Sequence, residues 1–234
     1  MKKVLSTAAL GIVVGFIALL LLSEQTTSSG IGATSASPMH IGWYTETVDS
    51  GSDGYRHSSL KLDRSGYPHI SYHRGDDLKY AYWSGSDWVL QTVGTSIAVP
   101  YGLGQHSSLT LDGDDHPHIA YYDGLTKDLK YVQWSGTEWV PQTVDSAGNV
   151  GKYASMALDS NDFPHISYYD ADNNAIKHAR WTGTGWLSET VEAGVGDGNV
   201  TSLAIDNDDK LHLSYYSLNP TALRAGCIGA RFGL

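Results

Sequence analysis

Cysteine is nearly absent from this chain of 234 residues, which contains only Cys227. A single cysteine excludes an intramolecular disulfide framework, and it supplies too few thiolates for a cysteine-based zinc site. The length suits one or two domains and is ample for a sizeable core. A stable fold therefore depends on packing.

Positive charge is also scarce. The chain carries 15 Lys and Arg against 25 Asp and Glu, a net charge of −10, and it has no basic run. This balance argues against a nucleic-acid partner and against docking on an anionic membrane surface. Aromatic residues and glycine are abundant instead, with 7 Trp, 15 Tyr and 26 Gly. This composition predicts an all-β protein rich in turns.

A long apolar segment occupies the first 22 residues. Lys2 and Lys3 precede an apolar run from Ala8 to Leu22, which is the layout of a signal peptide. The stretch is also near the length of a membrane span, so a retained anchor remains the alternative. Residues 23–40 follow as a Ser/Thr/Gly-rich linker. Either alternative predicts a secreted or cell-surface protein that touches the membrane only through this segment.

An internal repeat is the main feature of the remaining chain. The phrase SLxLD recurs as SSLKLD from Ser58, SSLTLD from Ser107, ASMALD from Ala154 and TSLAID from Thr201, at spacings of 49, 47 and 47 residues. A second marker, W-x-G-x-x-W, keeps step as WSGSDW, WSGTEW and WTGTGW. Repeats of this length indicate a repeated structural unit.

Each repeat predicts four short strands, a to d, separated by turns. In the first repeat they read SLKLD, PHISYH, LKYAYW and WVLQTV. Four antiparallel strands in about 47–49 residues are typical of a β-propeller blade, so the predicted fold is an all-β propeller of about four blades. A stacked array without ring closure is the alternative. The predicted propeller covers residues 41–234, with repeats starting at residues 57, 106, 153 and 200.

The two ends of the repeat region affect ring closure. Residues 43–48, WYTETV, match the strand d phrase and would complete the fourth blade in a closed ring. The last repeat reads LRAGCIGARFGL where LKYAYWSGSDW is expected, which indicates an incomplete or truncated blade. Unpaired edge strands would then promote self-association.

The W-x-G-x-x-W hairpin resembles the Asp-box of sialidase-type (BNR-repeat) propellers, which lies between the third and fourth strands. The wider repeat pattern is similar to repeats of secreted bacterial and archaeal propeller proteins. The resemblance covers residues 43–223 but lacks the Asp of S-x-D-x-G-x-T-W. It implies a propeller outside the cytoplasm and says much less about chemistry.

Each repeat carries a histidine in strand b. Because these histidines lie about 47 residues apart, they fall on different blades and cannot converge on one zinc ion. We expect each to be structural and to bond a turn carbonyl or the Asp of SLxLD. The paired tryptophans are expected to pack between blades, although an exposed pair could bind a sugar. The residues predicted to be structural are His69, His118, His165, His212, Trp83, Trp88, Trp134, Trp139, Trp181 and Trp186.

The acidic turns after strand a resemble the opening of a calcium loop. They lack the Glu twelve residues on that an EF-hand requires, and Asp and Asn are ordinary residues of such turns. No cofactor is therefore expected, and Ca²⁺ remains a weak alternative. Its candidate ligands are Asp112, Asp114, Asp159, Asn161, Asp206 and Asp208.

A ligand site is expected on the face formed by the d–a connections and the b–c loops, where the repeats differ. Its mix of aromatic and polar groups would suit a glycan or a protein surface. The candidates are Arg56, His57, Tyr101, His106, Asp123, Tyr153, Asp170 and Asn173.

No catalytic residues are predicted. A sialidase-like site needs clustered arginines for a substrate carboxylate, and no spacing brings three together in this chain. The sequence favours a non-catalytic binding, adhesion or scaffold module outside the cytoplasm, with glycan binding as one option. A sialidase-like enzyme and a truncated fragment without its own function are the alternatives.

Overall fold

The computed structural model describes residues 42–51, 54–95, 105–196, 200–219 and 221–228. The predicted signal peptide or anchor and the linker lie outside these ranges and stay predictions. In the described part of the chain, no helix is long and apolar enough to cross a membrane. The chain divides after Glu46, and every described strand lies in the unit that begins at Thr47.

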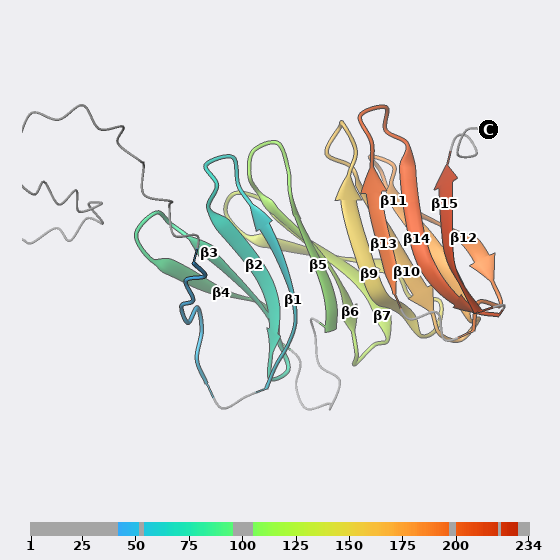
Figure 1. Cartoon of the computed structure of the whole chain (residues 1–234), viewed down its shortest axis with the longest axis horizontal. Coiled ribbons are helices and arrows are strands. Elements are labelled where there is room, and N and C mark those ends of the chain that lie inside the picture. The colour runs from blue at the N-terminus through green and yellow to red at the C-terminus, as the bar shows by residue number, and fades with distance from the viewer. Residues whose placement is uncertain (1–41, 52–53, 96–104, 197–199, 220, 229–234) are drawn as a thin grey trace, which may run out of the picture. The chain divides into compact units, whose positions relative to one another are not determined.

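Fifteen described strands form four antiparallel sheets in which sequence neighbours pair, three of them four-stranded and one three-stranded. Figure 1 shows the sheets as successive blades, so the predicted all-β, propeller-like fold is confirmed. Blade 1 contains β1 (Tyr55–Leu62), β2 (Pro68–Arg74), β3 (Asp77–Trp83) and β4 (Trp88–Thr95). Blade 2 contains β5 (Gln105–Leu111), β6 (Pro117–Asp123), β7 (Asp128–Trp134) and β8 (Trp139–Asp145). Blade 3 contains β9 (Val150–Leu158), β10 (Pro164–Asp170), β11 (Ala175–Trp181) and β12 (Trp186–Ala193), and blade 4 contains β13 (Thr201–Ile205), β14 (Leu211–Leu218) and β15 (Thr221–Ile228).

The second strand of each inner blade is buried on both faces. Every residue of β6 and of β10 is buried, because each sheet packs against a neighbour on either side. The hairpin between the third and fourth strands turns at Gly85, Gly136 and Gly183, whose φ angles of +96°, +94° and +89° favour glycine. The W-x-G-x-x-W phrase is therefore a turn signal as well as a packing signal.

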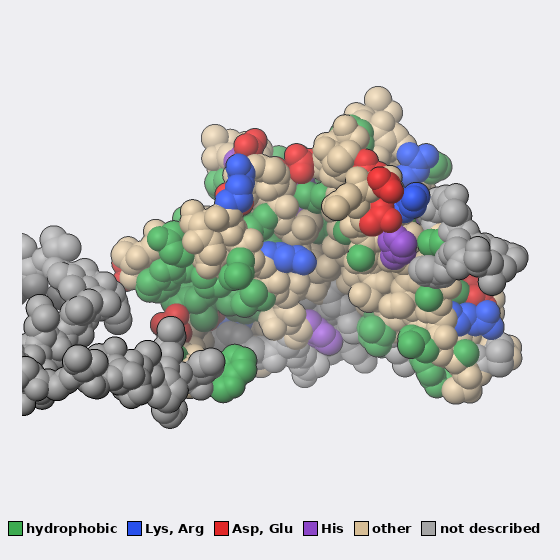
Figure 2. Space-filling model, turned by 45° about the horizontal axis from the view of Figure 1, so that its top comes forward, with side chains coloured by type: hydrophobic (Ala, Val, Ile, Leu, Met, Phe, Trp, Pro, Cys, Tyr) green, Lys and Arg blue, Asp and Glu red, His purple; other side chains and the backbone are tan. Residues whose placement is uncertain are grey.

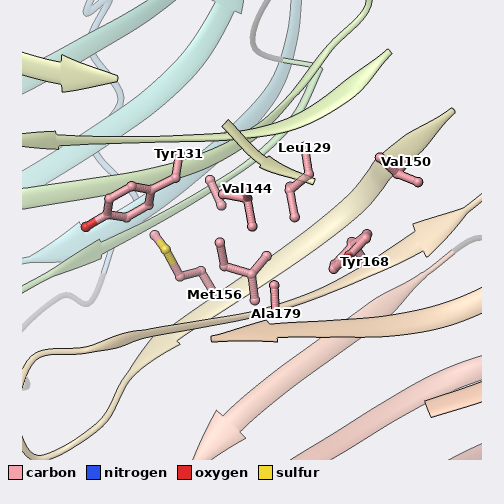
Figure 3. Close-up of a cluster of buried hydrophobic side chains, with 9 residues drawn as sticks. Leu129, Tyr131, Val144, Val150, Met156, Tyr168 and Ala179 are labelled. Carbon is pink, nitrogen blue, oxygen red and sulfur yellow. The ribbon is translucent and has the colours of Figure 1, made fainter. Parts of the chain in front are cut away.

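A hydrophobic core fills each space between successive blades. Between blades 1 and 2 it contains Leu78 and Leu109, and between blades 3 and 4 it contains Ile176 and Leu203. Figure 3 shows the core between blades 2 and 3, where Leu129 from β7 and Met156 from β9 belong to one cluster. Each blade therefore depends on its neighbours for burial.

Serine hydroxyls also join the innermost strands. β1 packs against β5, β5 against β9, and β9 against β13, as expected for strands around a propeller axis. The hydroxyl of the serine in SLxLD accepts a hydrogen bond from the next blade. The donor is the backbone N–H of the residue that directly follows the equivalent serine there. These bonds run from Leu109 N to Ser59 Oγ (3.0 Å), from Met156 N to Ser108 Oγ (3.0 Å) and from Leu203 N to Ser155 Oγ (2.9 Å).

Residues 43–48 carry no strand in this structure, and the fourth sheet ends at β15, so the predicted fourth strand stays a prediction. Asp49, just beyond this segment, instead bonds blade 1: the Tyr72 hydroxyl donates to its carboxylate at 2.8 Å and Arg74 Nη1 at 3.0 Å. The atypical last repeat nevertheless forms the third strand of its blade, since β15 pairs with β14 along its whole length.

Candidate ligand-binding site

The four strand b histidines lie beside the carboxylate of their own SLxLD phrase. Burial lowers the pKa values of His69, His118 and His165, so these three imidazoles are neutral at pH 7. Each contact stays within one blade, and the structural role expected from the sequence stays a prediction. The Nε2–Oδ2 distances are 3.6 Å for His69–Asp63, 3.4 Å for His118–Asp112, 3.7 Å for His165–Asp159 and 2.9 Å for His212–Asp206.

The acidic turns use their carboxylates to close the turns. Asp112 Oδ1 accepts the backbone N–H groups of Asp114 and His116, both at 2.8 Å. Asp159 and Asp206 do the same in their own turns. Within the described ranges, no group of three or more His, Cys, Asp or Glu side chains is arranged to hold a metal ion. The weak calcium candidates Asp112, Asp114, Asp159, Asn161, Asp206 and Asp208 are thus not assembled into a site there.

The paired tryptophans meet edge to face across their hairpins, with centroid distances of 5.8 Å, 5.4 Å and 5.5 Å in blades 1, 2 and 3. The second tryptophan of a pair also reaches the preceding blade. Trp139 packs on Tyr80 at 5.2 Å and donates Nε1–H to Gln91 at 2.9 Å. Trp186 repeats both contacts, with Tyr131 and Gln142. These tryptophans link blades.

The predicted loop face is described only in part, and several of its residues have a role in their own turns. Asp123 and Asp170 are buried, and their carboxylates accept N–H groups inside their own b–c turns, including that of Asn173. The turns therefore already use these two carboxylates, and their proposed contact with ligand stays a prediction. His57 and Tyr153 do share one repeat position: both interrupt the strand register with φ of +46° and +56°.

Three further candidates cannot be placed as side chains. Tyr101 lies outside the described residues, and for Arg56 and His106 only the strand backbone is described. Their proposed contact with ligand stays a prediction.

A cavity of about 580 Å³ opens where the innermost strands of all four blades end. It lies at the a–b turns, the opposite end of these strands from the predicted loop face. Its carboxylates are engaged in the turn network: Gly113 N donates to Asp162 Oδ1 at 3.2 Å, and Asp112 closes its own turn. This central cavity is polar and has few aromatic groups.

A second pocket, of about 200 Å³, lies between blades 1 and 2 and combines aromatic faces with convergent polar groups. We call it the inter-blade pocket. It lies between β2, β3 and β4 of blade 1 and the β5–β6 turn, the start of β6 and the end of β7 of blade 2. Its lining residues are His69, Tyr80, Tyr82, Gln91, Asp115, His116, Pro117 and Trp134.

The polar groups of the inter-blade pocket are held in place by their neighbours. Asp115 Oδ2 lies 3.4 Å from Arg64 Nε, and its Oδ1 accepts the Arg64 backbone N–H at 3.2 Å. Gln91 Oε1 accepts from Trp139, which directs its amide nitrogen as the donating end. His69 stacks on Tyr82 at 5.7 Å and hydrogen-bonds the Tyr80 hydroxyl through Nδ1. Burial raises the pKa of Tyr80, so its phenol stays protonated.

This pocket was missed from the sequence, although a signal was present. Tyr82 and His116 are the positions at which the repeats disagree: the next interface has Gln133 and Phe163 there. Gln133 accepts a hydrogen bond from Tyr131 at 2.8 Å. Tyr82 lies in β3 and His116 in the β5–β6 turn, so both differences between repeats fall outside the d–a and b–c loops where a ligand site was predicted.

No protein-family model and no curated protein sequence matches the chain. Among solved structures, it is similar to a protein of unknown function from Dyadobacter fermentans, with 12% identity and a TM-score of 0.54 over 74% of this chain and 60% of that one. It is also similar to a bifunctional GH43-CE protein from Bacteroides eggerthii, with 14% identity and a TM-score of 0.50 over 75% and 26%. A fucose lectin from Kordia zhangzhouensis, in complex with methyl-fucoside, matches with 22% identity and a TM-score of 0.42 over 58% and 99%. At these identities the likeness shows the fold alone.

Proposed function

We propose that this chain is an extracytoplasmic propeller module that binds a glycan in the inter-blade pocket without chemical turnover. The location rests on the apolar segment after Lys2 and Lys3. The binding role rests on one observation: the pocket brings aromatic rings and fixed hydrogen-bonding groups together in one solvent-accessible hollow.

The chemistry of the pocket suits a sugar ring. A pyranose presents a C–H face that packs on aromatic rings, here Tyr82 and Trp134, and hydroxyls that exchange hydrogen bonds with the Asp115 carboxylate and the Gln91 amide. The volume of about 200 Å³ lies below the ~300–1,000 Å³ of pockets for drug-sized ligands. We therefore expect it to hold one terminal residue of a glycan.

The lining favours binding over hydrolysis. A glycosidase ordinarily places two carboxylates on either side of the scissile bond. Asp115 is the one carboxylate among the lining residues. It is also held by Arg64, whose Nε lies 3.4 Å from its Oδ2.

The arginines support the same choice. A sialidase-like site would bring several guanidinium groups to one substrate carboxylate. Among the described side chains, Arg64 pairs with Asp115, Arg74 with Asp49, and Arg224 with Glu192 at 3.4 Å. Arg64 lies in the turn before β2, Arg74 at the far end of β2, and Arg224 in β15 of blade 4.

The test is glycan-array binding by the full chain in a mild non-ionic detergent, followed by titration calorimetry with the best glycan. The variants Tyr82→Gln and His116→Phe replace each residue by its counterpart at the next interface, so both are compatible with the fold. We expect each to weaken binding about tenfold or more, since each removes about 1.4 kcal/mol or more of contact.

The matched control is Phe163→Tyr, which changes the equivalent position at the blade 2–3 interface and should leave binding unchanged. Equal binding by Tyr82→Gln and wild type would contradict the proposed site. Release of sugar from a fluorogenic glycoside, lost in Asp115→Asn, would contradict the absence of turnover.

A further inference from the structure

The outer faces of the two end blades expose side chains at positions that are core elsewhere. Leu223 of β15 is 82% exposed, whereas its counterparts in blades 1 to 3 are fully buried. Leu60 of β1 is 56% exposed, whereas its counterparts in blades 2 to 4 are at most 9% exposed. The counterparts of Leu223 are Leu78, Leu129 and Ile176, and those of Leu60 are Leu109, Met156 and Leu203.

These two sets of counterparts contact one another at every observed interface. Leu78 and Leu109 share the core between blades 1 and 2. Leu129 shares a core with Met156, and Ile176 with Leu203. The same rule pairs Leu223 with Leu60, the two members that remain exposed. The outer face of blade 4 is thus complementary to the outer face of blade 1. On the view in Figure 2, hydrophobic side chains form a broad area at the end where blade 1 lies.

A second repeated contact marks blade 1 as the follower of another blade. Tyrosines of strand b bond a carboxylate at the end of the preceding blade's fourth strand: Tyr168 donates to Asp145 at 2.6 Å, and Tyr215 donates to Glu192. In blade 1, Tyr72 makes this bond with Asp49, at the same spacing of 23 residues. The WYTETV segment before Asp49 therefore has the position in the sequence of a preceding blade's fourth strand.

Blade 4 has three described strands where the other blades have four, so such a strand would complete its sheet. The outer edge of β15 pairs with no described strand. Beside it lies an apolar pocket of about 70 Å³, lined by His178, Leu203, Leu211, Leu213 and Cys227 among others. His178 is the counterpart of Tyr80 and Tyr131, on which Trp139 and Trp186 pack. The pocket thus matches the place of the missing tryptophan, and the matching residue in WYTETV is Trp43.

We propose that two copies of this chain join head to tail. Blade 4 of each copy packs on blade 1 of the other, and residues 43–48 of each copy add to β15 of the other as its fourth strand. Within one chain, β13 shows no packing on β1 like that between successive inner strands, and Leu60 and Leu223 stay exposed. Two head-to-tail contacts close the assembly at eight blades, within the ~4–8 of known propellers.

The known strand register makes the proposal testable at one residue pair. In blade 3, Arg180 of β11 pairs with His165 on one side and with Leu187 of β12 on the other. In blade 4, Cys227 pairs with His212, the equivalent of His165, so Cys227 has the position of Arg180. Leu187 corresponds to Tyr44. An added fourth strand therefore places Tyr44 opposite Cys227, at a Cα separation of ~4.5–5.5 Å that permits a disulfide.

The experiment oxidises the Tyr44→Cys variant of the full chain in non-ionic detergent and separates the products on a non-reducing gel. We expect a covalent dimer that disappears on reduction and is absent from Thr45→Cys and from Tyr44→Cys combined with Cys227→Ser. A cross-linked monomer would overturn the proposal in favour of closure within one chain. A ladder beyond the dimer, or no cross-link, would overturn it as well.

Sedimentation equilibrium with density-matched detergent gives an independent measurement. Wild type should have twice the mass of the chain, while Leu60→Asp and Leu223→Asp should each have the monomer mass. Leu187→Asp is the control, because Leu187 is 50% exposed but lies on blade 3, away from the end faces. A monomeric wild type, or a dimeric Leu223→Asp variant, would refute the interface.

Discussion

A single residue that departs from the repeat gives blade 3 a pair of buried histidines. Blade 3 has His178 where blades 1 and 2 have a tyrosine. Its Nε2 lies 3.1 Å from His165 Nδ1, the rings stack at 5.2 Å, and its Nδ1 lies 3.0 Å from Glu189 Oε1. A row of four titratable groups, ending at Asp159, thus runs through the blade.

Burial lowers the pKa values of both imidazoles, and Arg180 acts in the same direction on both; His178 further lowers the pKa of His165. Glu189 and Asp159 oppose this shift. The unfolded chain binds protons near the ordinary pKa of 6.5, at a pH where the folded chain does not. The free energy of unfolding therefore falls as pH falls below about 6.5.

We expect His178→Tyr to reduce this pH dependence, because one of the two buried imidazoles is replaced by the residue found in the other blades. The measurement is the melting temperature between pH 7.5 and 5. It should fall less in the variant than in wild type. The exposed His57 provides the control variant, His57→Gln, which should keep the wild-type slope. A wild-type slope in His178→Tyr would show that the pair does not govern acid stability.

At the residue scale, the sequence predicted the strand in which a side chain lies better than the groups that this side chain contacts. The strand b histidines and paired tryptophans have places that follow from the period alone. The ligand contacts proposed for Asp123 and Asp170 stay predictions, because a strand-end aspartate has the same sequence context whether it binds a ligand or closes its own turn. The inter-blade pocket depends on two blades meeting, so only the departures at Tyr82 and His116 could have indicated it.

The serine of SLxLD acts at the scale of the element, because its hydroxyl joins one innermost strand to the next. Ser155→Ala would leave the Leu203 N–H without this acceptor. We expect it to lower the free energy of unfolding by about 1 kcal/mol, and up to ~3 kcal/mol if no water replaces the hydroxyl. Chemical denaturation measures the change.

The same position in blade 4 supplies a matched control. Ser202 is exposed, and blade 4 is the last described blade. Ser202→Ala should stay within about 0.5 kcal/mol of wild type, as surface substitutions usually do. Equal effects of the two variants would mean that the inter-blade bond contributes no stability.

Strands were the part of the fold that sequence periodicity predicted well. In blades 1 to 3 the phrases for strands b to d lie within the observed strands, and the phrase for strand a does so except for its final Asp, which begins the turn. Residues 43–48 match the strand d phrase but carry no strand here, because a fourth strand also needs pairing with an edge, which the phrase alone does not determine. β15 forms despite its atypical sequence because β14 provides that edge.

At the scale of the whole molecule, burial increases along the row of blades from the ends to the middle. Packing between blades joins successive blades, so stability is the sum of blade terms and nearest-neighbour interface terms. Blades 2 and 3 have two interfaces each, whereas the end blades have one within the chain. The exposed Leu60 and Leu223 are the consequence.

Head-to-tail assembly should remove this difference, and hydrogen exchange can detect it. In wild type, the β15 amides should be protected by the added fourth strand and by the neighbouring blade 1. In Leu223→Asp, loss of assembly leaves them at an open edge, so we expect exchange at least tenfold faster, equivalent to about 1.4 kcal/mol. The amides of β7, inside blade 2, should change little because both of its interfaces remain. Equal β15 exchange in wild type and Leu223→Asp would contradict an added strand, whereas faster exchange in β7 as well would indicate general destabilisation instead.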